Sequence, residues 1–263
     1  MRAIILAAGE GKRLRVYTKD RPKCLVKLGG KPLLVYQYDA LRAAGVDDIS
    51  VVTGYRADRI RDLGCRTFHN DRFASTNMVA SLICAAELLD GSDDVLIAYG
   101  DIVYEASIVR AMVECQEPIC TAVDLEWLEL WRLRMQDPLR DAETLKLDPS
   151  GDIRELGKRP RVLDDIEGQY MGLTKVRAGL APRLVSCYHR IEEEAGVVAE
   201  DPSTMFMTDF LQRLIDDGLP VRAVPVRGGW LEVDTAADLE TYELMLAEDQ
   251  LGEFWNPESV GAR

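Results

Sequence analysis

Residues 3–14, with the sequence AIILAAGEGKRL, decide the fold of this chain. The stretch begins with a strand-sized apolar run, Ala3–Leu6, and glycines follow at positions 9 and 11. A continuous apolar run of this length is typical of a strand buried on both faces of a parallel sheet. Glycine lets backbone amides approach an anion closely, and Lys12 and Arg13 add positive charge. The stretch therefore predicts a buried first strand followed by a phosphate-binding loop.

This loop begins a strongly basic segment. Eight lysine and arginine side chains lie between residues 10 and 31, against two acidic ones. Such a density of positive charge beside two glycines favours a polyphosphate ligand, and a solvated basic loop is the alternative. The loop is not of the Walker type, because Gly-Lys-Ser/Thr is absent, and it lacks the third glycine of the dinucleotide-binding fingerprint.

The overall composition is that of a globular protein with an acidic surface. The 263 residues include 45 acidic and 32 basic side chains, for a net charge of −13, and 47% are hydrophobic. Nucleic acids and anionic membranes both require a basic face, so we expect neither as a partner. The longest apolar runs are far shorter than the ~20 residues of a membrane span. Six cysteines without a CxxC pair favour reduced thiols and a cytoplasmic protein.

Hydrophobic patterning predicts alternating strands and helices through the first half of the chain. The predicted strands are Ala3–Leu6, Ile49–Thr53, Arg66–His69 and Val95–Ala98, and the predicted helices are Pro32–Ala44, Ala57–Leu63 and Asn77–Leu89. This alternation predicts an α/β fold with a mostly parallel sheet and helices on both faces. Ligands of such sheets bind beyond the carboxyl ends of the strands, so the loops after Leu6 and Ala98 should line a site.

The second half of the chain is less regular and contains no linker that would mark a second domain. A Pro- and Gly-containing turn at 148–152 predicts a hairpin between Thr144–Leu147 and Ile153–Leu156. The other predicted strands are Ile119–Val123, Tyr170–Thr174 and Val221–Val226, and the predicted helices are Leu180–Glu194, Thr208–Asp217 and Ala236–Leu246. We expect one domain over residues 1–246 and a C-terminal tail over 247–263 that is either frayed or ordered by a partner.

Five motifs in this order resemble the signature of the nucleotidyltransferases that make nucleotide sugars and CDP-alcohols. They are Leu6–Leu14 (LAAGxGxRL), Arg21–Val26, Gly30–Leu34, Tyr99–Asp101 and Val233–Thr235. Within that superfamily, Ser75–Leu82, the stretch from Val123–Trp127 to Asp141–Glu143, and Gly168–Leu173 are similar to the cytidylyltransferases that act on phosphocholine and on phosphonates. The resemblance implies a Rossmann-like mixed sheet with a nucleotide-binding half (1–118) and an acceptor-binding half (119–246).

The resemblance also implies the reaction. An oxygen of a phosphate or phosphonate attacks the α-phosphorus of a nucleoside triphosphate, and pyrophosphate leaves. Two anions must meet, so catalysis rests on positioning and charge neutralisation. Arg13 is expected to neutralise the departing pyrophosphate, and Lys23 to reach the α-phosphate. Asp101 and Asp234 match the family's two metal ligands and would hold Mg²⁺, which prefers a few carboxylates; for Asp234, a cap of the helix at Ala236 is the alternative.

The nucleotide is expected to contact backbone and small polar side chains near the first strand. The nucleotide-binding residues expected from the resemblance are Leu6, Ala7, Ala8, Gly9, Gly11, Lys12, Arg13, Lys23, Thr76, Asn77, Ser81, Tyr99 and Gly100. For Thr76 and Asn77, an ordinary helix cap is the alternative. Lys12 could equally face solvent.

The acceptor-binding residues are expected in the second half. The candidates are Trp127, Glu143, Lys158, Tyr170, Asp209, Trp230 and Glu232. Their aromatic members could form a box for a quaternary ammonium group or could be core residues. The acidic members could instead hold the ammonium group of an aminophosphonate, and Lys158 could clamp the acceptor's phosphate or belong to a solvated loop.

The sequence thus predicts a magnesium-dependent transfer of CMP from CTP to a small phosphate monoester or phosphonate. Phosphocholine, 2-aminoethylphosphonate, hydroxyethylphosphonate and phosphonoformate represent the expected acceptors. Two alternatives stay open: a hexose-1-phosphate uridylyl- or thymidylyltransferase, and a non-catalytic nucleotide-binding regulatory protein. The oligomeric state also stays open, with a homodimer as one alternative.

Overall fold

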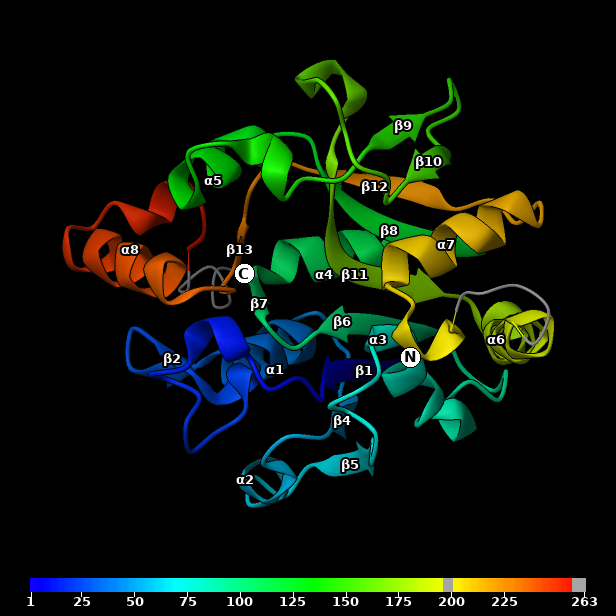
Figure 1. The fold of residues 1–263 in the computed structure, drawn as a ribbon, viewed down its shortest axis with the longest axis horizontal. Helices are drawn as coiled ribbons and strands as arrows, with labels where there is room; N and C mark the ends of the chain where they lie inside the picture. The colour runs from blue at the N-terminus through cyan, green and yellow to red at the C-terminus, as the bar shows by residue number, and fades with distance from the viewer. Residues whose placement is uncertain (196–200, 257–263) are drawn as a thin grey trace.

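A computed structural model describes residues 1–195 and 201–256. Its centre is a seven-stranded sheet in the order β12-β8-β11-β6-β1-β4-β5, in which only β11 runs antiparallel to its neighbours (Figure 1). The strands are β1 (Arg2–Ala7), β4 (Asp48–Thr53), β5 (Arg66–His69), β6 (Val95–Tyr99), β8 (Ile119–Asp124), β11 (Gln169–Val176) and β12 (Arg222–Val226). The predicted single α/β domain with a mostly parallel mixed sheet is confirmed.

Helices cover both faces of this sheet because successive side chains of its buried strands point to opposite sides. In β1, Ala3, Ile5 and Ala7 belong to one apolar cluster, and Ile4 and Leu6 belong to another. The first cluster includes residues of α1 (Leu33–Ala43), α4 (Ala106–Glu114), α5 (Trp127–Arg134) and α8 (Ala236–Ala247). The second includes residues of α3 (Met78–Ile83), α6 (Ala181–Ala195) and α7 (Met207–Asp216). A short helix, α2 (Ala57–Arg61), precedes β5.

The register of the sheet aligns the ends of its two central strands. Leu6 of β1 pairs with Tyr99 of β6 in parallel, so the loops that follow the two strands start side by side. Gly100 N–H donates to Leu6 O at 2.9 Å and extends this alignment past the end of β6. The glycine-rich loop and Asp101 therefore lie at one edge of the sheet.

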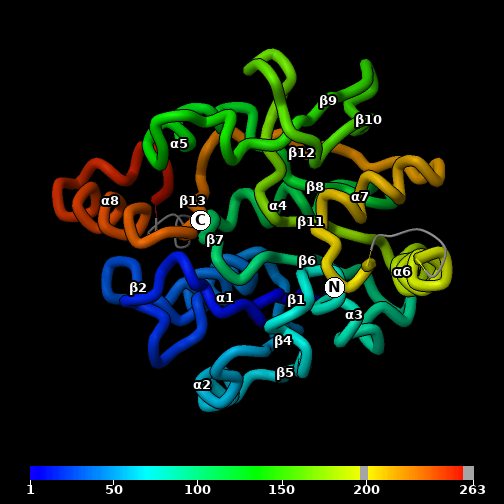
Figure 2. Tube along the Cα trace, in the orientation of Figure 1, coloured from blue at the N-terminus to red at the C-terminus, as the bar shows by residue number. Residues whose placement is uncertain are grey.

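A small two-stranded ladder brings the far end of the chain to the same edge. β7 (Ile102–Tyr104) lies beside β13 (Trp230–Glu232) (Figure 2). The two strands pair antiparallel, with Ile102 opposite Glu232 in the register. The next hydrogen bond, from Val233 N–H to Asp101 O at 3.0 Å, places Asp234 beside Asp101. The remaining short strands are the predicted hairpin β9 (Leu145–Leu147) and β10 (Ile153–Leu156), and the pair β2 (Lys27–Leu28) and β3 (Lys31–Pro32).

Three expectations from the sequence are wrong. The helix predicted over Asn77–Leu89 ends at Ile83, because the chain tightens into 3₁₀ turns that keep Leu88 buried. The tail is not frayed over its described part, since Trp255 is 2% exposed and packs edge-on against Tyr36 with ring centroids 4.9 Å apart. The end of the predicted tail, 257–263, lies outside the described residues.

The third correction concerns the cysteines. Cys115 follows α4 and Cys120 belongs to β8, and the turn between these two elements lets the two cysteines form a disulfide. The other four cysteines carry free thiols. Among the described residues, none of the helices is both long and apolar enough to cross a membrane.

Candidate active site

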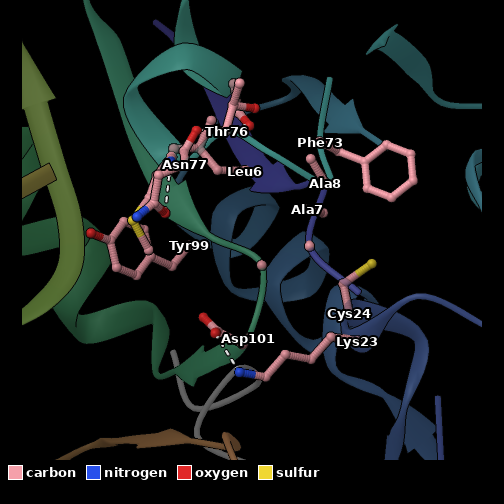
Figure 3. Close-up of a pocket in the computed structure, with 14 residues that line it drawn as sticks. Leu6, Ala7, Ala8, Lys23, Cys24, Phe73, Thr76, Asn77, Tyr99 and Asp101 are labelled. Carbon is pink, nitrogen blue, oxygen red and sulfur yellow. Dashed lines mark hydrogen bonds and ion pairs between the residues drawn. The ribbon is translucent and has the colours of Figure 1, made fainter. Parts of the chain in front are cut away.

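A cavity lies beyond the carboxyl ends of β1 and β6 and extends to the start of α3 (Figure 3). Its lining includes every nucleotide-binding residue that the sequence predicted except Gly11, Lys12 and Arg13. The lining residues are Leu6, Ala7, Ala8, Gly9, Lys23, Cys24, Phe73, Thr76, Asn77, Met78, Ser81, Tyr99, Gly100 and Asp101. Its walls are therefore backbone and small side chains on one side and polar side chains from the region of α3 on the other.

Two glycines are required by the shape of this site. Gly11 has a φ of 63°, a left-handed conformation that favours glycine, and a Cβ atom there would lie 3.0 Å from Lys23 Cβ. A Cβ atom on Gly100 would lie 2.8 Å from Leu6 O, closer than the two strand ends permit. Both positions keep the backbone close to neighbouring chain segments.

Asn70 organises the polar wall of the cavity. This residue follows β5 and is 4% exposed, and its Nδ2 donates to Thr76 Oγ1 at 2.9 Å and to Ser81 Oγ at 3.0 Å. Asn77 caps α3, as the alternative interpretation held, and still lines the cavity. The cap and the cavity wall are thus formed by the same segment.

A second cavity adjoins the first and shares Gly9, Lys23, Phe73 and Asp101 with it. Its lining includes the remaining predicted residues Gly11, Lys12 and Arg13, together with Glu10, Ala74 and Asp234. Lys12 pairs with Glu10 at 3.3 Å and is 68% exposed, so it faces solvent at the rim. Three basic side chains therefore line this cavity beside three carboxylates, and they supply the positive groups that a polyphosphate requires.

An acidic cluster lies at the wall of the second cavity. One carboxylate oxygen each from Asp101, Glu232 and Asp234 lie within 4.8 Å of one another. Lys23 Nζ lies 2.7 Å from Asp101 Oδ2 and 2.7 Å from Asp234 Oδ1. Arg13 Nη1 lies 2.5 Å from Asp234 Oδ2. The helix cap proposed as an alternative for Asp234 is instead provided by Thr235, whose hydroxyl accepts from Asp238 N–H.

These charges shift one another's ionisation. Burial alone would lower the pKa of Lys23, but the charges of Asp101 and Asp234 outweigh it and raise that pKa above its ordinary value. Burial alone would raise the pKa of Asp234, but the Lys23 ammonium and the hydrogen bond that it donates hold that pKa below its ordinary value. Lys23 is therefore charged, and so is Asp234, at neutral pH.

A third cavity shares Arg13 with the second, and its lining includes four of the predicted acceptor residues: Glu143, Tyr170, Trp230 and Glu232. Arg13, Met78, Tyr99, Ile102, Trp131, Asp141, Gln169, Met171, Gly172, Phe206 and Thr208 complete its lining. Glu143 Oε1 accepts one long hydrogen bond, 3.4 Å from Thr208 Oγ1, and burial raises the pKa of Glu143 to about 6, with Asp209 and Asp141 adding to the shift. The cavity is acidic and aromatic.

The other three predicted acceptor residues lie outside this cavity. Trp127 is 4% exposed and packs against Trp131, with ring centroids 5.7 Å apart. Lys158 pairs with Glu155 at 2.6 Å on the surface, and Asp209 accepts from Phe206 N–H at the start of α7. Trp127 is thus a core residue, Lys158 forms a surface ion pair, and Asp209 caps the start of α7.

The comparisons with known proteins agree with this geometry. Residues 3–157, more than half of the chain, match the family described as the MobA-like NTP transferase domain. The chain belongs to this family of nucleotidyltransferases. One relative, the CTP:phosphoglutamine cytidylyltransferase of Campylobacter jejuni, is 37% identical over 249 residues, which cover 91% of this chain and 98% of the relative.

Two further proteins are similar to this nucleotidyltransferase, one in sequence and one in fold. The choline-phosphate cytidylyltransferase of Streptococcus pneumoniae is 42% identical over 96 residues, which cover 35% of this chain and 42% of that protein. The solved structure of a CTP:phosphocholine cytidylyltransferase from Streptococcus pneumoniae has the same fold, with a TM-score of 0.71 and 23% identity, covering 93% of this chain and 98% of that one. The predicted family and its likeness to the cytidylyltransferase branch are confirmed.

Sequence reasoning missed several residues of the nucleotidyltransferase site. Asn70 and Phe73 follow β5. Ligands of parallel sheets bind beyond the carboxyl ends of the strands, so the loop after this predicted strand could have been searched for site residues. Asp141 and Gln169 line the third cavity; both belong to motifs that the sequence analysis quoted, but neither was chosen as a site residue. Arg134 pairs with Glu232 at 2.6 Å and is also absent from the sequence-based set.

Proposed function

We propose that this nucleotidyltransferase is a magnesium-dependent cytidylyltransferase that transfers CMP from CTP to a small phosphate monoester or phosphonate and releases pyrophosphate. The observation that carries the proposal is the meeting of three cavities at one charged cluster. Lys23 and Asp101 line both the first and the second cavity, and Arg13 lines both the second and the third. A nucleotide, its phosphates and an acceptor can thus occupy adjoining cavities that meet at this cluster.

The proposed division of the chain follows the same cavities. The first two are lined mostly by residues of 1–118, and the third mostly by residues of 119–246. CTP is the proposed donor because the relatives described above are named as cytidylyltransferases. The nucleotide would occupy the first cavity, and its β- and γ-phosphates the second.

Each charged residue has a proposed role in the displacement. An acceptor oxygen forms a bond to the α-phosphorus, and the bond from that phosphorus to the bridging oxygen of the β-phosphate breaks. Lys23 would stabilise the charge on the α-phosphate, and Arg13 the charge on the departing pyrophosphate. No nucleophilic side chain is needed, because the acceptor supplies the attacking oxygen.

Mg²⁺ is the proposed metal because the donor set fits it. Asp101, Glu232 and Asp234 supply only carboxylate oxygens, which suit this hard cation, and Lys23 Nζ already stands as a positive charge between two of them. When bound, the ion would neutralise charge on the phosphate oxygens. Lys23 would then turn from the carboxylates towards the α-phosphate.

The acceptor is proposed to carry a cationic group at the end remote from its phosphate or phosphonate. Glu143, Asp141 and Glu232 line the third cavity, whereas Arg13 is its one basic lining residue within the described chain. The aromatic side chains of Trp131, Tyr170 and Trp230 also line it, and a cation gains from their faces. Phosphocholine and 2-aminoethylphosphonate both meet this requirement.

The proposal is tested by measuring pyrophosphate release with CTP, UTP and dTTP against a panel of acceptors. The panel comprises phosphocholine, 2-aminoethylphosphonate, hydroxyethylphosphonate, phosphonoformate and glucose 1-phosphate. We expect release with CTP and a cationic acceptor, and slower release with the uncharged or anionic analogues. Faster turnover of glucose 1-phosphate with UTP or dTTP would replace the proposal by the hexose-1-phosphate alternative. Nucleotide binding without turnover of any acceptor would favour a regulatory protein.

A further inference from the structure

Arg134 is a buried cation directly behind the acidic cluster. It is the last residue of α5, and its side chain is 1% exposed. Nη1 lies 2.6 Å from Glu232 Oε2, and Nη2 lies 3.6 Å from Asp238 Oδ2. The guanidinium group also lies 5.2 Å from the centre of the Trp131 ring. One arginine thus connects α5 to β13 and to α8.

Asp238 extends this connection to the backbone of Asp234. The oxygen atom that faces Arg134, Oδ2, accepts the backbone N–H of Asp234 at 3.0 Å and that of Thr235 at 2.8 Å. Asp238 is 2% exposed and belongs to the first turn of α8. Arg134 is therefore linked to the side chain of one member of the acidic cluster and, through Asp238, to the backbone of another.

A buried ion pair such as that of Arg134 with Glu232 is weak evidence of a contribution to stability, because the cost of desolvating the charges can exceed their attraction. A buried guanidinium group is costly to desolvate, and apolar residues of similar size often replace such groups without loss of stability. Among the described residues, Arg134 Nε and Nη1 have no hydrogen-bond partner of good geometry, so the desolvation cost is only partly offset. Nη1 still forms an ion pair with Glu232, although the geometry between the two is not that of a hydrogen bond.

We infer that Arg134 is a positioning residue that holds Glu232 and the Asp234 segment in the arrangement that binds the divalent ion. The inference rests on the proposed function, since it assumes a metal ion at the acidic cluster. Arg134 is buried and lines none of the three cavities, so it acts through Glu232 and Asp238 and does not touch the substrates. Removing a group that supports a metal ligand from behind typically lowers the affinity for the metal 10- to 100-fold.

The test measures metal binding directly. Mn²⁺ is titrated into the protein with saturating CTP and no acceptor, and free Mn²⁺ is followed by electron paramagnetic resonance, with CTP alone as the reference. We expect Arg134→Met to weaken Mn²⁺ binding to the protein–CTP complex about 10- to 100-fold. Arg134→Lys should be intermediate, because an ammonium group keeps the charge but cannot reach both carboxylates as a fork. Arg132→Met removes an exposed arginine of the same helix and should match the wild type.

The outcomes separate the inference from the proposed function. If the wild type binds no Mn²⁺ beyond that held by CTP, the proposed metal site is wrong, and the inference is overturned with it. If the wild type binds and a folded Arg134→Met variant binds equally well, the inference alone is wrong. Circular dichroism checks that each variant folds. If Arg134→Met does not fold, the Mn²⁺ titration is repeated with Arg134→Lys and Asp238→Asn. Unchanged Mn²⁺ affinity in both of these variants would overturn the inference.

Discussion

Lys23 Nζ lies 2.7 Å from Asp234 Oδ1, although 211 residues separate the two in sequence. The same ammonium group lies 2.7 Å from Asp101 Oδ2. The β7–β13 ladder brings the two aspartates together, and the 3₁₀ turn after Pro22 brings Lys23 to them. A cation of the protein therefore stands where the proposed function requires a metal ion, so the two must compete for the same carboxylates.

Replacing Lys23 tests this competition. Lys23→Ala should lower kcat about 10²- to 10³-fold, because one preorganised positive group at the reacting phosphate is lost. It should also lower the free energy of unfolding by about 1–3 kcal/mol, since Asp101 loses its ion-pair partner and, among the described residues, Asp234 keeps only Arg13. Added Mg²⁺ should raise the free energy of unfolding of the Lys23→Ala variant more than it raises that of the wild type. Thermal denaturation with and without Mg²⁺ measures the difference; an identical response to the ion in both proteins would contradict the competition.

Asp101→Asn should make the enzyme require more magnesium. The substitution keeps the size of the side chain and removes one charged oxygen ligand, so we expect the Mg²⁺ concentration for half-maximal activity to rise at least about tenfold. Asp71→Asn is the control, because Asp71 is 92% exposed and lines none of the three cavities. Unaltered magnesium dependence in Asp101→Asn would exclude Asp101 as a ligand.

Glu143 should impose a pH dependence on the binding of a cationic acceptor. Burial raises the pKa of Glu143 to about 6, so this carboxyl is neutral below that pH and charged above it. The KM for 2-aminoethylphosphonate should fall as the pH rises through about 6, apart from any contribution from ionisation of the phosphonate itself. Glu143→Gln should have a high KM that lacks this step, and initial-rate measurements between pH 5 and 8 would show whether the step remains.

The raised pKa of Glu143 also affects the stability of the fold. Ionisation of Glu143 should favour binding of a cationic acceptor but destabilise the folded state. A carboxyl group whose pKa is higher in the folded state than in the unfolded state favours folding when protonated, so its ionisation destabilises the fold as the pH rises from about 4.5 to about 6. Glu143→Gln should therefore raise the free energy of unfolding at pH 7 by about 1–2 kcal/mol. Denaturant titrations at pH 4.5 and 7 provide the check, and a variant that is less stable than the wild type at pH 7 would contradict it.

Trp255 should contribute strongly to stability despite its place near the end of the chain. It is 2% exposed and packs against Tyr36 of α1, so Trp255→Ala should cost about 3–5 kcal/mol. Leu244→Ala is a suitable control because Leu244, on α8, is 60% exposed. Urea denaturation measures both variants. Equal stability of Trp255→Ala and the wild type would mean that the tail is frayed, one of the two alternatives that the sequence left open.

The first half of the fold could be predicted because its signals are local. The apolar run Ala3–Leu6, the glycines after it and the strand before Gly100 each carry their own pattern, and the pairing of parallel strands brings their ends together. The cavity at those ends accordingly contains most of the residues that were predicted for it.

The remaining features depend on contacts between distant segments. β7 and β13 are each three residues long and pair across 126 to 130 positions of sequence. Strands this short carry no periodic signal. Trp255 lies in a short segment without periodic hydrophobicity, and its partner Tyr36 lies on α1. Lys158 and Asp209 have residue types suited to an acceptor site, but their nearest partners are local, Glu155 and the backbone of Phe206.

The central claim is that this site transfers CMP, and the most direct measurement follows the α-phosphorus. With CTP labelled at that atom, Mg²⁺ and 2-aminoethylphosphonate or phosphocholine, we predict that the label moves to a CMP–acceptor conjugate in a 1:1 ratio with released pyrophosphate. Lys23→Ala should slow this transfer about 10²- to 10³-fold. Label that stays in CTP with every acceptor, or that appears only as free CMP, would contradict the account.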